Sequence, residues 1–309
     1  MALDTFERIW RQVFARVPIA DTFLCQQWVN HTFRDIAEHR QWSWLRSRAQ
    51  FLFPTLTNAG TVSVVRGSST VTGIGTTWTG AEVGQQFRLN NIVPIYTITS
   101  VDPVGQTLTI DDVFGGMTTT GTYQIYLAYV TVPTNFHSFI SIYDVTTNRL
   151  ILDNITQHDL DKRDAQRTNT GDPFYLVPFD YDTVSSPPLP RYEMWPHVLS
   201  QRVVPFLYET RPVDLMDAGA TLPRYIRGDI LLEGALRKAA LWPGPSAELK
   251  NPYFNIALAG IHQGAFDKMV VEMAVKDDEV YETDTTYEPW GFTPEGPFGD
   301  AKWMQSHIG

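Results

Sequence analysis

Cysteine is almost absent from this chain. Its 309 residues include one, Cys25. One thiol cannot form a disulfide within the chain, and it cannot by itself supply the thiolate ligands of a structural zinc site. The sequence therefore excludes a scaffold held by internal disulfides and offers no basis for dithiol redox chemistry.

Long hydrophobic runs are also missing. No stretch approaches the roughly eighteen consecutive apolar residues that a membrane-spanning helix needs. Residues 1–4 lack the basic start and apolar core of a secretory signal. With 43% hydrophobic residues, the composition is that of a globular protein with one large or two modest domains. We expect it to be made and assembled in a host cytoplasm, without contact with a membrane.

Positive charge is scarce, and no basic stripe is present. The net charge is −10, and the stretch from Asp277 onward holds eight acidic residues but only one lysine, Lys302. Tight duplex binding depends largely on cations placed against phosphates. The sequence therefore excludes specific DNA recognition, while non-specific passage of DNA past the protein stays compatible with it.

Familiar catalytic and metal-binding motifs are missing too. The seven histidines form no His-Glu-x-x-His pattern, so His39 and His262 are expected to be surface or interface residues rather than ligands. The sequence Gly73-Ile74-Gly75 lacks the Lys-Ser/Thr of a phosphate loop and predicts a turn. No Gly-x-Ser-x-Gly elbow occurs. We expect no catalytic residue, no bound metal and no cofactor.

Two pairs of carboxylates are the remaining candidates for a catalytic or metal-binding site. Asp159-Leu160-Asp161 and Asp180-Tyr181-Asp182 each place two acids two residues apart. Such pairs can support acid–base catalysis or bind calcium, but neither has the glycine and terminal glutamate of an EF-hand loop. Solvated loop charges or helix caps are the favoured interpretation. The chain is therefore predicted not to be an enzyme.

Two helices are predicted at the start of the chain. Apolar residues at three- and four-residue spacing predict the first behind a capping-box-like Asp4-x-x-Glu7, and Pro18 ends it. Its apolar residues are Phe6, Ile9, Trp10, Val13, Phe14 and Val17. The second begins with Asp21 as cap and runs to about Arg40. Its apolar face includes Leu24, Cys25, Trp28, Val29, Phe33 and Ile36. The aromatic stretch 42–45 is expected to anchor this helix pair on a core or a neighbouring subunit.

The pattern changes to short strands between residues 59 and 132. This segment contains fifteen threonines and only six charged residues, with apolar–polar alternation between turn signals. A small β barrel or sandwich is predicted. The expected strands are Thr61–Val65, Thr70–Thr72, Gln86–Leu89, Tyr96–Val101, Thr107–Ile110 and Tyr123–Tyr129.

Aromatic residues in this β module suggest a second, non-enzymatic function. They could stack on sugars or bind a partner, but strand alternation favours core positions. The residues concerned are Trp78, Phe87, Tyr96, Tyr123 and Tyr126.

The remaining chain is expected to mix strands and helices. The expected elements are strands at Ser138–Val145, Arg149–Leu152, Phe174–Val177 and Val203–Tyr208, with a polar helix near Gln157–Arg167. The Pro-rich stretch 185–190 predicts a loop. Two later helices are striped by Leu232, Ala235, Leu236 and Ala239, and by Phe254, Leu258, Ile261 and Ala265. The sequence Trp242-Pro243-Gly244-Pro245 ends the first, and Asn251-Pro252 is expected to open the second.

Several short motifs resemble those of tailed-bacteriophage structural proteins. The β segment contains Gly60-Thr61-Val62-Ser63-Val64, Gly67-Ser68-Ser69-Thr70-Val71-Thr72-Gly73-x-Gly75-Thr76-Thr77-Trp78-Thr79 and Val83-Gly84-x-x-Phe87. Its flanks contain Gln26-Gln27-Trp28-Val29-Asn30, Trp42-Ser43-Trp44-Leu45, Arg211-Pro212-Val213-Asp214-Leu215, Leu222-Pro223-x-Tyr225 and Leu231-Leu232-x-Gly234-Ala235-Leu236. Taken together, they resemble the phage head–tail adaptor (connector or neck ring) family over most of the chain.

The resemblance implies a structural function in the virion. Adaptors of this family form rings, commonly of twelve copies, between the portal protein and the tail, around a lumen through which DNA passes. Tail tube, nozzle or fibre proteins would bind below. A portal-docking arm would begin at Tyr281 and use Tyr281, Tyr287, Trp290, Phe292, Phe298 and Trp303. The alternative is a tail-fibre or neck decoration protein that binds a glycan or tail component through the β module.

The predicted fold class is α+β, with a helical-bundle, ring-forming body, an inserted all-β module and an extended C-terminal arm. The expected segments are 1–58 (N-terminal helices), 59–132 (β module), 133–276 (mixed remainder of the body) and 277–309 (acidic arm). Large apolar residues on the helices are expected to pack the ring and its helices. They are Phe6, Trp10, Trp28, Trp42, Trp44, Leu232, Leu236 and Leu258.

Overall fold

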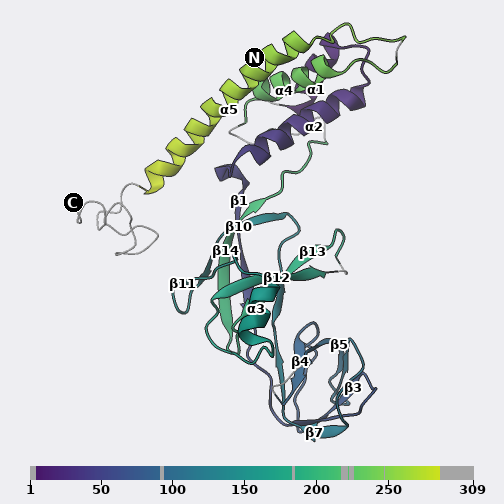
Figure 1. The fold of residues 1–309 in the computed structure, drawn as a ribbon, viewed down its shortest axis with the longest axis vertical. Coiled ribbons are helices and arrows are strands. Elements are labelled where there is room, and N and C mark those ends of the chain that lie inside the picture. Colours follow the sequence, from purple (N-terminus) through teal and green to yellow (C-terminus); the bar gives the residue numbers. More distant parts are fainter. Residues whose placement is uncertain are drawn as a thin grey trace, which may run out of the picture. The chain divides into compact units, whose positions relative to one another are not determined.

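The computed structural model describes residues 5–90, 94–182, 185–216, 222, 226–246 and 248–285, with only the backbone for 278–285 (Figure 1). The described residues form five α-helices and fourteen β-strands in three sheets. The expected helical-bundle body is therefore wrong. The protein is mostly β, because β-branched and aromatic residues continue to form strands well beyond residue 132.

Contacts divide the chain into two compact units. The first joins the residues up to Arg46 to those from Arg211 onward, and the second comprises Ser47–Thr210. Four of the five helices belong to the first unit, which we call the helical unit, and nearly all strand residues belong to the second, the β unit. The four segments expected from the sequence remain a prediction about which parts fold independently.

The helical unit contains α1 (Phe6–Arg16), α2 (Thr22–His39), α4 (Gly228–Leu241) and α5 (Ile256–Thr285). Asp21 caps α2 as predicted, since its carboxylate accepts a hydrogen bond from the Phe23 amide at 3.4 Å. The expected cap Asp4 lies outside the described residues, and Thr5 holds the N-cap position without a side-chain cap bond. The apolar stripes that predicted α1 and α2 therefore locate both helices correctly.

The beginning of α5 corrects the sequence-based prediction. Asn255 caps this helix, because its side-chain oxygen accepts from the amides of Ala257 and Leu258 at 2.9 and 3.2 Å. Asn251 instead closes α4, donating from Nδ2 to the carbonyls of Ala239 and Trp242. The expectation that Asn251-Pro252 opens α5 is therefore wrong, because the Asn251 side chain donates to backbone carbonyls at the end of α4 instead.

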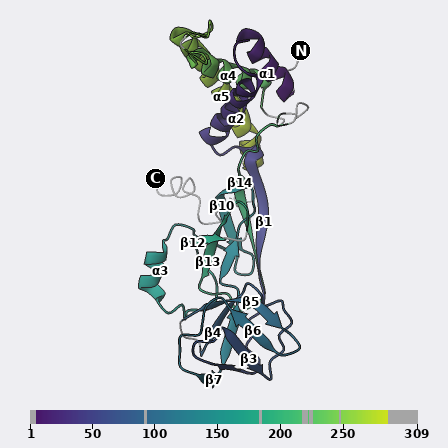
Figure 2. The ribbon, with the colours of Figure 1, turned by 90° about the vertical axis from the view of Figure 1, so that its right-hand side faces the viewer.

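The largest sheet has seven strands in the order β7-β2-β3-β6-β5-β4-β8, and it curls on itself (Figure 2). Its strands are β2 (Thr61–Val64), β3 (Thr70–Ile74), β4 (Gln86–Leu89), β5 (Tyr96–Asp102), β6 (Thr107–Ile110), β7 (Thr119–Gly121) and β8 (Tyr123–Tyr126). All pairs are antiparallel. The core includes Val62, Val71, Phe87, Ile98 and Leu108. The alternation of apolar and polar residues predicted a small β module at this place in the chain.

Two smaller sheets complete the β unit. One has the order β1-β14-β10-β11 and the other β12-β13-β9. Their strands are β1 (Arg46–Phe53), β9 (Tyr129–Thr131), β10 (Phe136–Asp144), β11 (Arg149–Leu150), β12 (Tyr175–Asp182), β13 (Leu189–Trp195) and β14 (Arg202–Thr210), and α3 (Gln157–Asp164) lies between β11 and β12 in sequence. Phe51, Phe136, Leu176, Met194 and Phe206 help to form their shared core.

Sequence analysis missed the short strand β7, and it missed the longer strands β1 and β13. Strand β1 begins with three charged or polar residues and shows apolar alternation only from Phe51. Strand β13 begins inside the Pro-rich stretch expected to be a loop, and Pro190 pairs in register with Tyr181 of β12. In both cases the pairing with distant strands determines the conformation more than local composition does.

Candidate interaction surface

Helix α5 is apolar on two opposite sides. Its inner side buries Val270 and Met273 in the core of the helical unit. On its outer side Ile256, Ile261, Val271 and Val275 are 71%, 68%, 59% and 53% exposed. A surface helix normally presents polar residues to water, and a helix that is hydrophobic all round is normally buried. The outer side of α5 therefore has the composition of a contact surface.

Exposed residues of both charge signs lie on this part of α5. Asp267, Lys268, Glu272 and Lys276 are all exposed on α5. Glu272 lies 3.8 Å from Arg227, which directly precedes α4, so part of this charge is paired within the subunit.

A buried hydroxyl–imidazole–carboxylate chain fixes the inner side of α5 to α4. His262 is 8% exposed; its Nδ1 lies 2.6 Å from Glu233 Oε2 on α4, and its Nε2 lies 2.8 Å from the Tyr253 hydroxyl. His262 was expected to be a surface or interface residue, but it is buried within the subunit, with one ring nitrogen bound to Glu233 of α4 and the other to Tyr253 in the loop before α5. Because His262 faces α4, the preceding residue, Ile261, points to the outer side of α5.

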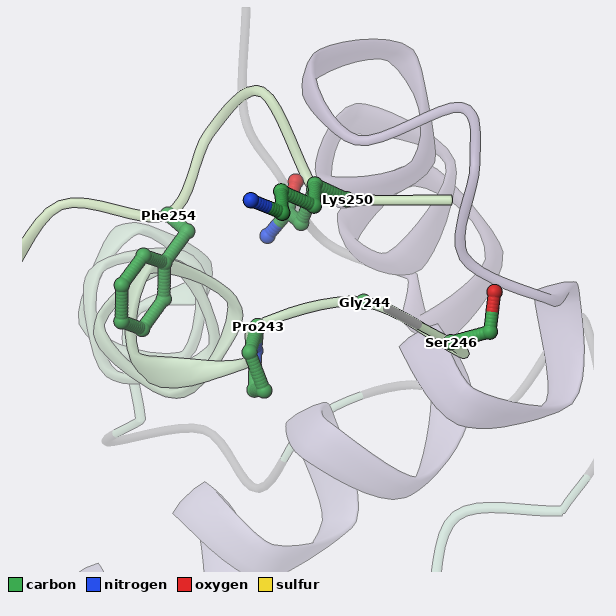
Figure 3. A pocket seen from close by; sticks show the side chains of 6 residues that line it. Pro243, Gly244, Ser246, Lys250 and Phe254 are labelled. Atoms are coloured by element: carbon green, nitrogen blue, oxygen red, sulfur yellow. The ribbon is translucent and has the colours of Figure 1, made fainter. Parts of the chain in front are cut away.

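A pocket of about 580 Å³ lies at the connection between α4 and α5. Figure 3 shows the side chains of Pro243, Lys250 and Phe254 arranged around it. Lys250 is the cation among its lining residues, and Asn251 holds the loop through the two α4 carbonyls. The pocket has an apolar wall with one positive charge, and no catalytic geometry is formed by these residues.

The residues predicted to pack helices lie mainly in the core of the helical unit. Five are buried there, namely Phe6, Trp28, Trp42, Leu232 and Leu236. Trp10 and Trp44 are partly buried against the same core, and Leu258 is half-buried on α5. The indole of Trp42 donates to the Ile36 carbonyl at 2.6 Å, so the aromatic stretch 42–45 packs on its own subunit.

The residues expected to form a portal-docking arm cannot be placed. Tyr281 lies in α5, where only the backbone is described, and Tyr287, Trp290, Phe292, Phe298 and Trp303 lie outside the described residues. Their function stays a prediction.

The aromatic residues considered as a sugar-stacking platform are core residues. Trp78, Phe87, Tyr96, Tyr123 and Tyr126 are all at most 6% exposed. The Trp78 indole donates to the Tyr123 hydroxyl at 3.1 Å, and the two rings meet edge to face. Buried rings cannot stack on a glycan, so these five residues do not form the binding surface that the alternative function needs.

Both carboxylate pairs have structural partners. Asp159 completes a capping box with Thr156 at the start of α3, and Asp161 pairs with Arg167 at 2.6 Å. Asp180 forms an ion pair with Arg191 on the neighbouring strand β13. Among the described residues, no group of three or more histidine, cysteine, aspartate or glutamate side chains is placed to hold a metal ion.

The β unit contains a buried polar network that sequence analysis did not detect. Arg88 of β4 donates to Gln124 at 2.7 Å and to the Arg167 carbonyl at 2.6 Å. Arg167 Nε donates in turn to Glu193 at 2.7 Å, and His197 Nε2 lies 3.3 Å from the same carboxylate. The network links the seven-stranded sheet to the segment after α3 and to β13. No sequence signal marks it, because its members are far apart in the chain.

Burial and charge perturb the ionisation of this network. Burial lowers the pKa of His197, and the hydrogen bond that His197 makes to the Glu193 carboxylate opposes that shift only in part. Burial alone would raise the pKa of Glu193, but the bond to His197 and the charge of Arg167 outweigh it and leave that pKa below the usual range. The network therefore holds a neutral imidazole beside a charged carboxylate.

Comparisons with protein-family models and with curated proteins found no match for this chain. Within the part that the structure describes, no helix combines the length and apolar character needed to cross a bilayer.

Proposed function

We propose that this chain is a structural virion protein, a head–tail adaptor that assembles as a ring between the portal and the tail of a tailed bacteriophage. The observation that carries the proposal is the apolar outer side of α5, which requires a cover that the described residues of one subunit do not supply. The short motifs of the β segment and its flanks, which resemble phage structural proteins, support the head–tail junction as the place of assembly.

Charge is compatible with this function. An acidic protein around a lumen does not retain DNA by releasing counterions from it, so the genome can pass without being held. In this proposal the adaptor works through contact alone, without a cofactor or a catalytic residue. About twelve copies would bind the portal above and tail tube, nozzle or fibre proteins below.

The site of the protein in the particle tests this proposal. A small tag in the β5–β6 turn at Val104, which is 96% exposed, labelled with gold in purified virions, is expected to mark one vertex, directly below the portal. The same label on the capsid faces, on fibre tips or absent from the virion would contradict the adaptor function. Virions carrying the untagged chain control for non-specific binding of the label.

A further inference from the structure

The outer side of α5 leads directly into the last segment of the chain. Its exposed apolar residues run from Ile256 to Val275. Helix α5 ends at Thr285, and the 24 residues 286–309 follow it. A long exposed apolar surface is a contact site for some partner. This segment is the part of the chain that is attached to the helix carrying that surface.

The segment 286–309 is long enough to cover the whole outer side. From Thr285 back to Ile256 the helix spans roughly 44 Å, at a rise of 1.5 Å per residue. A chain of 24 residues reaches roughly 80 Å, at 3.3 Å per residue. The segment can therefore return along α5 within its own subunit.

The composition of this segment suits an apolar surface. Its aromatic residues, which offer large apolar contact areas, are Tyr287, Trp290, Phe292, Phe298 and Trp303. Its prolines, which lack the amide donor that a helix or a strand ladder needs, are Pro289, Pro294 and Pro297. Contacts of aromatic side chains with a surface, rather than backbone pairing, are therefore the interactions that this segment can make best.

Charge favours the same pairing. On α5, Glu272 lies 3.8 Å from Arg227, whereas Lys268 and Lys276 form no ion pair with any residue that the structure describes. The acids of the segment are Glu288, Glu295 and Asp300, and Lys302 is its one base. Carboxylates of the segment can therefore meet the two free lysines. Surface ion pairs of this kind are weak, so they add selectivity more than strength.

Covalent attachment gives the chain's own segment an advantage over a second copy. Two groups joined by a short flexible linker meet at an effective concentration of about millimolar. At micromolar protein concentration, a contact within the subunit therefore forms in preference to the same contact between subunits.

We propose that residues 286–309 return along α5 and cover the outer side of this helix in the free subunit. Equal distances from Thr285 place Phe292 near Val271, roughly 22 Å back, and Gly296 near Ile261, roughly 36 Å back. The consequence for assembly rests on the proposed function. A portal that binds the segment frees the outer side of α5 for a neighbouring subunit, so the ring closes only where a portal is present.

Thiol labelling of the full-length chain tests the cover. The native thiol does not interfere, because burial raises the pKa of Cys25 to about 11 and it has no exposed surface. Ile261→Cys is labelled with a maleimide, with and without replacement of the five aromatic residues of the segment by serine. The replacement is expected to speed labelling about tenfold, because the segment then no longer covers the thiol. Ala15→Cys, exposed on α1, is the matched control and should react equally fast in both backgrounds.

The dependence of labelling on protein concentration identifies the occupant. Protection of Ile261→Cys that is the same at low and high concentration supports cover by the chain's own segment. Equal labelling rates with and without the five aromatic residues overturn the proposal. Protection that appears only as the concentration rises assigns the surface to a second copy, and it overturns the proposal as well.

A cross-link tests the direction of the segment. The full-length variant with Val271→Cys and Phe292→Cys is treated with a short bis-maleimide, and the linked peptides are detected by mass spectrometry. The link within one chain is expected at a yield about tenfold above that of the control pair Ala15→Cys and Phe292→Cys. A yield no higher than the control contradicts the return along α5. The gold label tests the adaptor function without this contact, so either proposal can fail alone.

Discussion

At the scale of single residues, the buried polar network makes the stability of the β unit depend on pH. His197 has no exposed surface, and burial lowers its pKa below the ordinary value of 6.5. The unfolded chain therefore binds a proton at a pH where the folded chain does not. The stabilisation that the folded state gains from neutral His197 is fully present above about pH 6.5, and it is lost as the pH falls below that value.

We predict that unfolding of the β unit requires less urea at pH 5.5 than at pH 7.5. The free energy of unfolding should fall by up to about 1.4 kcal/mol per pH unit from His197 alone. His197→Gln keeps a donor for Glu193 but cannot titrate, so it should flatten the dependence. His137→Gln, exposed on β10, is the control and should leave the slope unchanged. Equal slopes for wild type and His197→Gln would contradict the prediction.

A second prediction at this scale concerns Trp78. Because it is 2% exposed and hydrogen-bonded to Tyr123, Trp78→Ala should destabilise the seven-stranded sheet by about 3–5 kcal/mol through the cavity it leaves. Thermal unfolding followed by near-ultraviolet circular dichroism measures the change. Trp78→Phe, which retains most of the volume, should cost clearly less. An unchanged melting temperature for Trp78→Ala would show that the ring does not support the core.

At the scale of elements, Asn251 makes several of the hydrogen bonds that hold the junction between α4 and α5. Asn251 is 4% exposed and donates to Ala239 and Trp242, while its side-chain oxygen accepts from the Tyr253 amide at 3.0 Å. The direction in which α5 leaves the loop, and therefore the orientation of its outer side, follows from these bonds.

We predict that Asn251→Ala destabilises the helical unit by about 1–3 kcal/mol, because it removes the side-chain donor to two carbonyls at the end of α4 and leaves the Ala239 carbonyl with the Trp242 amide alone. Urea unfolding followed by far-ultraviolet circular dichroism measures this. Asn251→Asp tests the mechanism, since it keeps the acceptor for Tyr253 and removes the donors, and it should be at least as destabilising. A variant with wild-type stability would show that other contacts hold the junction.

At the scale of the whole molecule, the acidic and aromatic end of the chain is expected to bind the portal. We predict that removal of residues 286–309 leaves a folded protein, because residues between Phe6 and Ala274 form the three described cores. The truncated chain should lose portal binding in a pull-down with purified portal rings. Replacing the five aromatic residues of this segment by serine should have the same effect while keeping its length. Unimpaired binding by either variant would rule out the arm.

The sequence by itself determined those features that depend on neighbours along the chain. Residues Phe6, Ile9 and Val13 recur at helical spacing, so α1 was predictable, and Asp21 marked the beginning of α2. Alternation between turn signals located most strands from Thr61 to Ile110. Helix caps and turns are local interactions, and a short stretch of sequence contains all the information they need.

Only the tertiary structure decided the rest. Pro190 suggested a loop, yet pairing with β12 and β9 makes its segment a strand, and charged residues from distant segments meet in the Arg88–Glu193 network. Helix α5 has apolar residues on two sides, and only the structure shows which side packs against α4 and which is exposed. These features depend on which residues far apart in sequence come together, and hydrophobic burial and strand pairing settle that over the folded chain as a whole.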